Sequence, residues 1–220
     1  IVRMVHALSD HVVTNSQVLK QQFSLQGSHT PVTCIYNGIE LEHYRGIHHP
    51  NPPNTPVFGI LGQILARKGH GEFVEAAERL LNQVEARFVI RGPEHHSAFE
   101  AQLKERIKRS PKLARAFQWF PYTESPDAIY QGLDVIVMPS HTASFGRVAI
   151  EAQAAGIPVI ASDIEGPAEI LNRSAALVPP KTVAPLYDAM LRLASDTAWW
   201  LELHRRGLEN SARFSTALSA

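Results

Sequence analysis

Short apolar runs alternate along the chain with longer segments whose apolar residues have helical spacing. The runs at 57–61, 135–138 and 159–161 show no alternation of polar and apolar positions, which is typical of strands covered on both faces. The pattern therefore predicts an α/β fold in which a parallel sheet has helices on both faces. Further strands are expected at 11–14, 32–35, 87–92, 117–122 and 176–178, and helices at 1–8, 16–25, 70–82, 99–109, 125–132, 146–155, 183–194 and 197–213.

The stretch 135–163 holds two of these strands around an alanine-rich helix, which indicates a βαβ unit. Gly156 and Pro158 follow the helix, as residues that end helices commonly do. The loop 140–145 then lies between the carboxyl end of a strand and the start of the helix at Gly146. Ligands of open α/β sheets bind at such a place, and the free N–H groups and dipole of the helix start favour a phosphate.

A second strand, loop and helix covers 57–82, with glycines at both ends of its loop, 62–69. Arg67 and Lys68 directly precede the helix, where a cation can meet a phosphate held by the helix start. The glycine spacing matches neither the dinucleotide motif nor the P-loop. By itself this loop therefore leaves two interpretations of Lys68 open, a phosphate ligand or an ordinary surface lysine.

The composition, with 45% hydrophobic and 19% charged residues, is that of an ordinary globular domain. A formal net charge of zero and a pI near 7.4 argue against nucleic acid as a partner. Cys34 is the only cysteine, which excludes an internal disulfide and favours a reducing compartment. No apolar run approaches the roughly 20 residues needed to cross a bilayer. We therefore expect a cytoplasmic protein.

The chain begins at Ile1 on an amphipathic pattern that is already under way, and we interpret it as a fragment of a longer protein. The stretch 48–54 is rich in proline and polar residues and is expected to be a linker. His43, His48 and His49 lie near two glutamates, but their spacing matches no known ligand pattern, so no metal site is predicted.

Several short motifs follow one another in a fixed order: Gly62, Lys68-Gly69, Pro139-Ser140, Phe145-Gly146, Glu151-Ala152, Ala155-Gly156, Pro158-Val159, Ser162-Asp163, Gly166-Pro167-Ala168-Glu169 and Arg213-Phe214-Ser215. Together they resemble the signature of family 4 retaining glycosyltransferases, which have the GT-B architecture. The resemblance implies a Rossmann-like sheet forming the C-terminal half of a GT-B fold at 55–220. Residues 39–54 would be the interdomain linker, and 1–38 the end of the N-terminal, acceptor-side domain. Asn37-Gly38 would mark the passage between domains, although the dipeptide is also an ordinary turn.

The resemblance also implies a site for a nucleotide diphosphate sugar, with Lys68 and Glu151 as catalytic residues. Lys68 would bind the diphosphate and Glu151 the ribose hydroxyls, while Phe145 and Gly146 would bring backbone N–H groups to the donor. The donor-binding residues expected in this way are Gly62, Gln63, Lys68, Ala143, Ser144, Phe145, Gly146, Arg147 and Glu151. Neither a metal nor another cofactor is expected.

Two positions depart from the family pattern. Ala143 stands where the family has a glutamate that grips hydroxyls of the donor sugar, and a methyl group cannot accept a hydrogen bond. Gln63 stands where the family has an arginine on the diphosphate, and glutamine brings no charge. Arg67 is the neighbouring cation that could replace it.

By the resemblance, the full-length protein would transfer a hexose from a nucleotide diphosphate sugar to an acceptor hydroxyl, with retention at the anomeric carbon. This activity would serve glycan or polysaccharide biosynthesis. A sugar or lipid-linked acceptor would be bound mainly by the missing N-terminal domain, and the full-length protein could associate peripherally with the inner face of the membrane. The fragment itself is expected to bind the donor without transferring sugar.

Two other functions stay open at this point. One is a non-catalytic nucleotide-sugar-binding protein of the same fold, suggested by Ala143 and Gln63. The other is a nucleotide-sugar epimerase of related architecture, which would need no acceptor. An oxidoreductase is disfavoured because the dinucleotide motif is absent.

Overall fold

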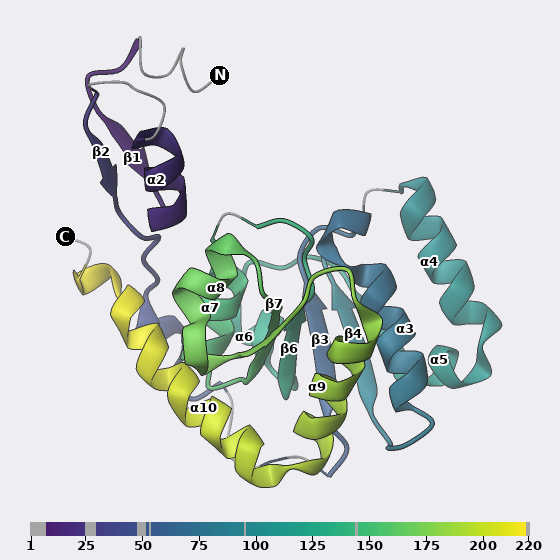
Figure 1. The fold of residues 1–220 in the computed structure, drawn as a ribbon. Coiled ribbons are helices and arrows are strands. Elements are labelled where there is room, and N and C mark those ends of the chain that lie inside the picture. Colours follow the sequence, from purple (N-terminus) through teal and green to yellow (C-terminus); the bar gives the residue numbers. More distant parts are fainter. Residues whose placement is uncertain are drawn as a thin grey trace.

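The computed structural model describes residues 8–24, 30–47, 52, 54–94, 96–143 and 145–218. Within them, six parallel strands form one sheet in the order β5-β4-β3-β6-β7-β8 (Figure 1). This is the strand order of a doubly wound fold, and its direction reverses between β3 and β6. The predicted α/β fold is thereby confirmed. The strands are β3 (Val57–Leu61), β4 (Arg87–Arg91), β5 (Phe117–Phe120), β6 (Val135–Met138), β7 (Val159–Ser162) and β8 (Ala176–Val178).

Successive residues of each central strand belong to two apolar cores, one on each face of the sheet. On β6, Val135 and Val137 pack in one core and Ile136 in the other. The strands β4 and β7 show the same alternation. Because both faces are covered, apolar residues are favoured at every position, and the strands lack a polar alternation.

Helices α3, α4, α5 and α9 contribute to the first core and α6, α7 and α8 to the second, while α10 packs along α7. The sequence pattern does not predict α5, although Ser110 caps it and proline is its first residue. No helix among the described residues has both the length and the apolar character needed to cross a membrane. The bounds are α3 (His70–Leu80), α4 (Ala98–Arg109), α5 (Pro111–Ala116), α6 (Pro126–Tyr130), α7 (Arg147–Ala154), α8 (Glu165–Leu171), α9 (Val183–Ser195) and α10 (Thr197–Ser211).

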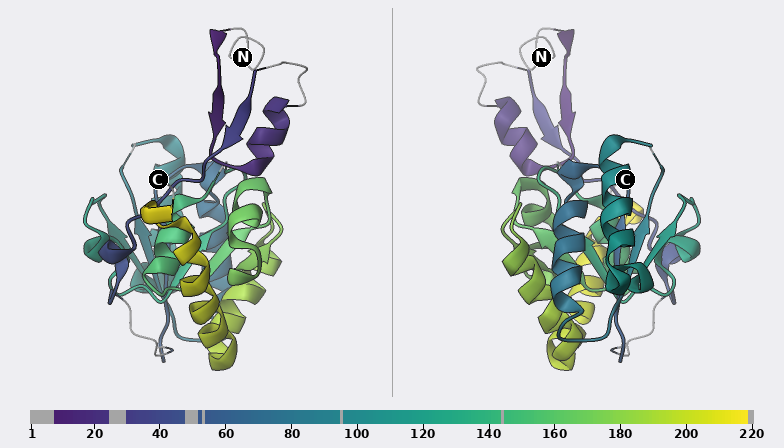
Figure 2. Two further views of the ribbon diagram at one scale, coloured as in Figure 1. Left: turned by 90° about the vertical axis from the view of Figure 1, so that its left-hand side faces the viewer. Right: turned by 90° about the vertical axis from the view of Figure 1, so that its right-hand side faces the viewer.

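Residues 8–24 and 30–36, called here the N-terminal part, project from the main body (Figures 1 and 2). Its strands β1 (Val12–Thr14) and β2 (Val32–Cys34) pair in parallel, apart from the six-stranded sheet, and α2 (Gln17–Ser24) connects them. The predicted helix at 1–8 lies almost wholly outside the described residues, and so does most of the linker at 48–54, with His48 and His49. The domain boundaries stay a prediction.

The end of the chain returns to the point where the N-terminal part begins. The backbone N–H of Ile39 donates to the carbonyl of Phe214 at 2.7 Å, and that of Thr216 donates to the carbonyl of Ile39 at 3.0 Å. These bonds form a parallel bridge between Ile39 and Ser215. The Arg213-Phe214-Ser215 motif therefore lies beside the connection between the N-terminal part and the sheet.

Glu169 of α8 attaches the N-terminal part to the main body. Its carboxylate accepts hydrogen bonds from the backbone N–H groups of Gln17 at 2.8 Å and Val18 at 3.2 Å, and from the hydroxyl of Tyr36 at 2.6 Å. The first N–H groups of a helix have no partner within it, and the helix dipole favours a negative charge beside them. Burial, and then the hydrogen bond to Glu169, raise the pKa of Tyr36 to about 12, so its hydroxyl stays a donor at neutral pH.

The first residue of α3, His70, is fully buried. Its Nδ1 lies 3.3 Å from the carbonyl oxygen of Leu65, and its Nε2 has no hydrogen-bond partner among the described residues. Burial is the main cause that lowers the pKa of His70 from 6.5 to about 4. The imidazole is therefore neutral at pH 7 and adds no positive charge to the loop before α3.

We expect Glu169→Gln to loosen the start of α2, because a hydrogen bond to a charged group contributes about 1.5–3 kcal/mol to stability. Amide hydrogen exchange at Gln17 and Val18 should then speed up by roughly tenfold or more. The control is Glu165→Gln, because Glu165 accepts an exposed side-chain bond from Gln22. Equal exchange of the two amides in Glu169→Gln and wild type would contradict this role.

We also expect the free energy of unfolding to fall when the pH is lowered from 6.5 to 4. The fall should be about 3 kcal/mol larger in wild type than in His70→Gln. The sign follows from the lowered pKa of His70. The unfolded chain binds a proton on this residue near pH 6.5, whereas the folded chain binds it only near pH 4. Urea denaturation of both proteins across this range measures the difference. His43→Gln controls for the loss of an exposed histidine. A difference that does not change with pH would refute the prediction.

Candidate functional site

A cavity of about 750 Å³ opens at the carboxyl ends of β3 and β6, where the strand order reverses. We call it the Lys68 cavity. In open α/β sheets, ligands bind at such a reversal. The residues that line it are Asn15, Asn37, Ile60, Leu61, Arg67, Lys68, Val137, Met138, Ser140, His141, Thr142, Ala143, Phe145, Gly146, Arg147, Val148, Ile164 and Glu165.

The loop before α3 forms one wall of this cavity, and its backbone is pressed against the loop after β6. Gly69 has φ +79°, and a Cβ there would lie 2.1 Å from the carbonyl oxygen of Pro139, so only glycine fits. The N–H of His141 donates to the carbonyl of Arg67 at 2.8 Å. The His141 ring reaches over to α3, where its Nε2 lies 2.7 Å from Oε1 of Glu72.

These contacts place the half-buried Lys68 inside the cavity. Burial, and then the charge of Arg67, lower the pKa of the Lys68 ammonium from its ordinary value. No hydrogen bond or ion pair of this ammonium is found in the described part of the chain. A desolvated cation without a partner is a ready binding group for an anion.

The opposite wall is the start of α7. Gly146 precedes this helix with φ +106° and has no side chain with which to cap it. The free N–H groups and the positive end of the helix dipole therefore remain available to an anion in the cavity. The Phe145 side chain does not lie open in the cavity, because its ring packs against those of Tyr36 and Phe214 at 6.1 and 5.9 Å between centroids.

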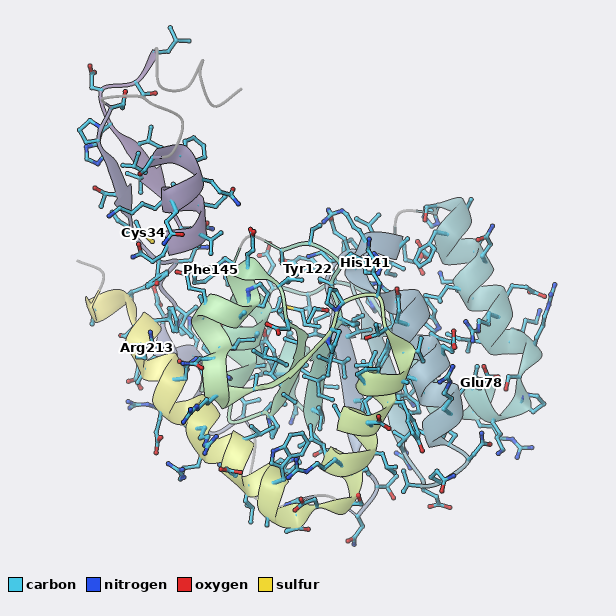
Figure 3. The ribbon with its side chains drawn as sticks, in the orientation of Figure 1. Cys34, Glu78, Tyr122, His141, Phe145 and Arg213 are labelled. Carbon is cyan, nitrogen blue, oxygen red and sulfur yellow. The ribbon has the colours of Figure 1, made fainter. Side chains whose placement is uncertain are left out.

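A second cavity, of about 490 Å³, adjoins the first and shares Leu61, Arg147 and Val148 with it. We call it the Glu151 cavity. Figure 3 shows Tyr122 and His141 along the edge of the sheet that also carries Phe145. The residues lining the Glu151 cavity are Tyr44, Leu61, Gly62, Arg91, Tyr122, Thr123, Glu124, Pro126, Ile129, Tyr130, Arg147, Val148 and Glu151.

Glu151 is buried on α7 with both of its oxygens engaged. The Tyr130 hydroxyl donates to Oε2 at 2.7 Å, and the Arg147 Nε donates to Oε1 at 2.5 Å. Tyr44 packs edge-on against Tyr130, with 5.8 Å between ring centroids. Burial and the charge of Glu151 raise the pKa of Tyr44 to about 12 and that of Tyr130 well above its ordinary value. Both hydroxyls therefore stay protonated donors.

The structure brings most of the predicted site residues together. Lys68, Ala143, Phe145, Gly146 and Arg147 line the Lys68 cavity. Two further predicted residues, Gly62 and Glu151, line the adjoining cavity, as Arg147 does. The roles assigned to these residues stay predictions.

Two predicted residues do not join them. Gln63 is exposed and is absent from the linings of both cavities, so its prediction as a donor-binding residue gains no support from the geometry. The adjacent Gly62 has φ +112°, a backbone conformation that favours glycine. Ser144 lies outside the described residues.

Among the polar lining residues that the sequence reasoning did not predict are Asn15, Asn37 and His141. Asn15 follows β1, Asn37 follows β2, and both line the Lys68 cavity. The N-terminal part therefore contributes to the lining of this cavity. His141 also lines this cavity. Arg91 lines the Glu151 cavity, and its guanidinium donates to the carbonyls of Ala128 and Ile129. Arg91 ends β4 and His141 follows β6, so the convergence of strand ends at one edge of the six-stranded sheet was the available signal for these two residues. Asn15 and Asn37 follow strands of the separate two-stranded sheet, and this signal does not extend to them.

The described residues include no cluster of three or more His, Cys, Asp or Glu side chains that could hold a metal ion. Of the histidines considered for such a site, His43 lies 3.1 Å from Glu40 in an exposed pair.

Known proteins with similar sequences are glycosyltransferases. The D-inositol 3-phosphate glycosyltransferase of Corynebacterium urealyticum is 30% identical over 172 residues, which cover 74% of this chain and 41% of that protein. The lipopolysaccharide core biosynthesis mannosyltransferase LpsB of Rhizobium meliloti is 32% identical over 153 residues, covering 64% of this chain and 43% of that protein. The chain thus spans less than half the length of either relative.

The fold is shared with solved structures. Anabaena HepE in complex with UDP-glucose has a TM-score of 0.86 to this chain at 19% identity, covering 99% of this chain and 63% of HepE. At this identity the likeness shows the fold alone, that of the GT-B glycosyltransferases. The sequence model of the family described as Glycosyl transferases group 1 matches residues 55–196, which include Lys68, the start of α7 and Glu151. The match extends over more than half of the chain, which therefore belongs to the glycosyl transferases group 1 family.

Proposed function

We propose that this chain is the donor-binding half of a glycosyltransferase that takes a hexose from a nucleotide diphosphate sugar. The whole protein transfers it to an acceptor hydroxyl with retention at the anomeric carbon. The observation that carries the proposal is the junction of two cavities at the switch point of the sheet. One offers a partnerless cation and a helix start, and the other a buried carboxylate among aromatic side chains. A nucleoside diphosphate carries matching groups at both ends.

The diphosphate occupies the Lys68 cavity. Lys68 and Arg67 approach it from one wall and the N–H groups at the start of α7 from the other. These donors are fixed before the ligand arrives, so they can stabilise the charge that develops on the leaving diphosphate as the glycosidic bond breaks. The protein needs no metal ion for this task, because the cations and the helix dipole act on the same oxygens.

The nucleoside occupies the Glu151 cavity. A carboxylate is acceptor-only when ionised, which suits the two hydroxyl donors of a ribose. Tyr122 is 60% exposed at the rim of this cavity, where a base can stack on its ring. HepE, which shares the fold, has been solved with UDP-glucose, and this supports UDP as the first nucleotide to test.

The sugar extends from the diphosphate toward Ala143 and the two asparagines of the N-terminal part. Carboxamides of Asn15 and Asn37 can both donate and accept, as hexose hydroxyls require. The acceptor, a sugar or lipid-linked group, is bound mainly by residues beyond this half of the protein. A place in glycan or polysaccharide biosynthesis is supported by the name of LpsB, a relative of this chain.

A non-catalytic nucleotide-sugar-binding protein is the second candidate. It is favoured by the methyl group of Ala143 in the Lys68 cavity and by the exposed position of Gln63 outside both cavities. Assaying the full-length protein for donor hydrolysis and sugar transfer separates the two functions. An epimerase is no longer proposed, because the family match is to transferases.

We expect this chain to bind a nucleoside diphosphate and to lose affinity in Lys68→Ala and Glu151→Gln. Each change removes hydrogen bonds to a charged group, which costs about 1.5–3 kcal/mol, or roughly 10–150-fold in Kd. Lys68→Ala should weaken UDP but leave uridine unaffected, whereas Glu151→Gln should weaken both. Calorimetry with UDP, GDP and ADP and their nucleosides measures these differences.

Lys108→Ala is the matched control, because Lys108 is an exposed lysine on α4. It should bind every ligand as the wild type does. If wild type binds one of these nucleotides and neither site variant weakens it, the site has been assigned to the wrong residues.

A further inference from the structure

Arg147 lies where the two cavities meet. It is the first residue of α7 and lines both of them. Its Nε holds one oxygen of Glu151 at 2.5 Å, and the Tyr130 hydroxyl holds the other at 2.7 Å. In this structure, protein groups therefore occupy both oxygens of the carboxylate to which we assign the ribose.

The pair of Arg147 and Glu151 is asymmetric. The Arg147 side chain is 68% exposed, whereas that of Glu151 is 10% exposed. A cation in the first turn of a helix faces the positive end of the helix dipole, which disfavours it there. Glu151 provides the compensating negative charge from one turn further along. The exposed arginine can leave with little desolvation, but the buried carboxylate must receive new hydrogen-bond donors in its place, which a ligand with hydroxyl groups supplies.

Arg67 and Lys68 line the Lys68 cavity, and a diphosphate bound there can also accept hydrogen bonds from a third cation. Gln63, which stands where an arginine is expected on the diphosphate, is exposed and lines neither cavity. Arg147 is the first residue of the helix whose start faces this cavity, and its exposed side chain lines the cavity as well. A diphosphate at the helix start would cancel the unfavourable dipole and give the guanidinium two phosphoryl oxygens to bind.

We propose that Arg147 exchanges partners when the nucleotide binds, an inference that rests on the proposed function. In the free protein its guanidinium covers Glu151. In the complex, the ribose hydroxyls take its place on Glu151, and the guanidinium turns into the Lys68 cavity to bind the diphosphate. Arg147 thereby supplies the charge that Gln63 lacks. Neither Glu151 nor Arg147 is left unpaired in either state.

The exchange gives Arg147 opposite effects on a nucleoside and on its diphosphate. Uridine must displace Arg147 from Glu151 and offers it no anion in return. UDP offers both the hydroxyls and the diphosphate. A residue that merely orients Glu151 would affect the two ligands equally, since both carry the same ribose. A residue that merely blocks the site would weaken both.

The test compares uridine and UDP binding to wild type, Arg147→Gln and Arg147→Lys, by calorimetry for UDP and by NMR titration for uridine. Guanosine with GDP and adenosine with ADP are measured in parallel, because the base is not yet assigned. For Arg147→Gln we expect UDP, or whichever diphosphate binds wild type most tightly, to bind at least tenfold more weakly. The matching nucleoside should bind as tightly as to wild type or a few-fold tighter. Arg147→Lys, which keeps the charge, should recover part of the lost diphosphate affinity.

Arg205→Gln is the matched control, because Arg205 forms a pair with Glu209, four residues further along α10, in which both side chains are exposed. It should change no affinity. Equal weakening of nucleoside and diphosphate in Arg147→Gln, or no weakening of the diphosphate, would overturn the exchange while leaving the proposed function intact. If the wild type binds none of these nucleosides or nucleotides, the proposed function fails and the exchange fails with it.

Discussion

The close contact between the loop before α3 and the loop after β6 is the constraint on which the site depends. Gly69 and the carbonyl of Pro139 are so near that a Cβ at residue 69 would overlap it, at 2.1 Å. The N–H of His141 then bonds to the carbonyl of Arg67, and its ring to Glu72. Two segments about 70 residues apart are thus fixed in one arrangement. These contacts, together with the pairing of β3 and β6, keep Lys68 and the start of α7 on the same cavity.

Much of this arrangement follows from local features of the sequence. Strands buried on both faces need apolar residues at every position, so β3, β6 and β7 are evident as uninterrupted apolar runs. The carboxyl ends of parallel strands meet at one edge of the sheet, so residues just after them can be expected to converge. This reasoning was sufficient to predict that Lys68 and Gly146 lie near each other, whereas Glu151 was assigned to the site only by the family resemblance. Helix α5 was not predicted, because its six residues are too few to show a helical period.

Such reasoning does not predict in which direction an exposed side chain points, or which segments far apart in the chain pack together. The pairing of Arg147 with Glu151 depends on which rotamer an exposed arginine adopts, and the sequence does not specify this. Gln63 lies in a predicted loop, yet its exposed side chain lies outside the linings of both cavities, which the sequence alone did not indicate. Asn15 joins the Lys68 cavity only because the N-terminal part docks on α8, more than 100 residues further along the chain.

That docking connects the N-terminal part to the Lys68 cavity through α8. Glu169 holds the start of α2, and Glu165, the first residue of α8, lines the cavity together with Ile164 before it. Ile39 is fixed to the end of the chain by two backbone hydrogen bonds. Any rotation of the N-terminal part must therefore occur between Tyr36 and Ile39, and it must either break the bonds of Glu169 or carry α8 with it. Because Asn37 lies within this short segment and lines the Lys68 cavity, such a rotation would change the shape of the cavity on the side of the N-terminal part.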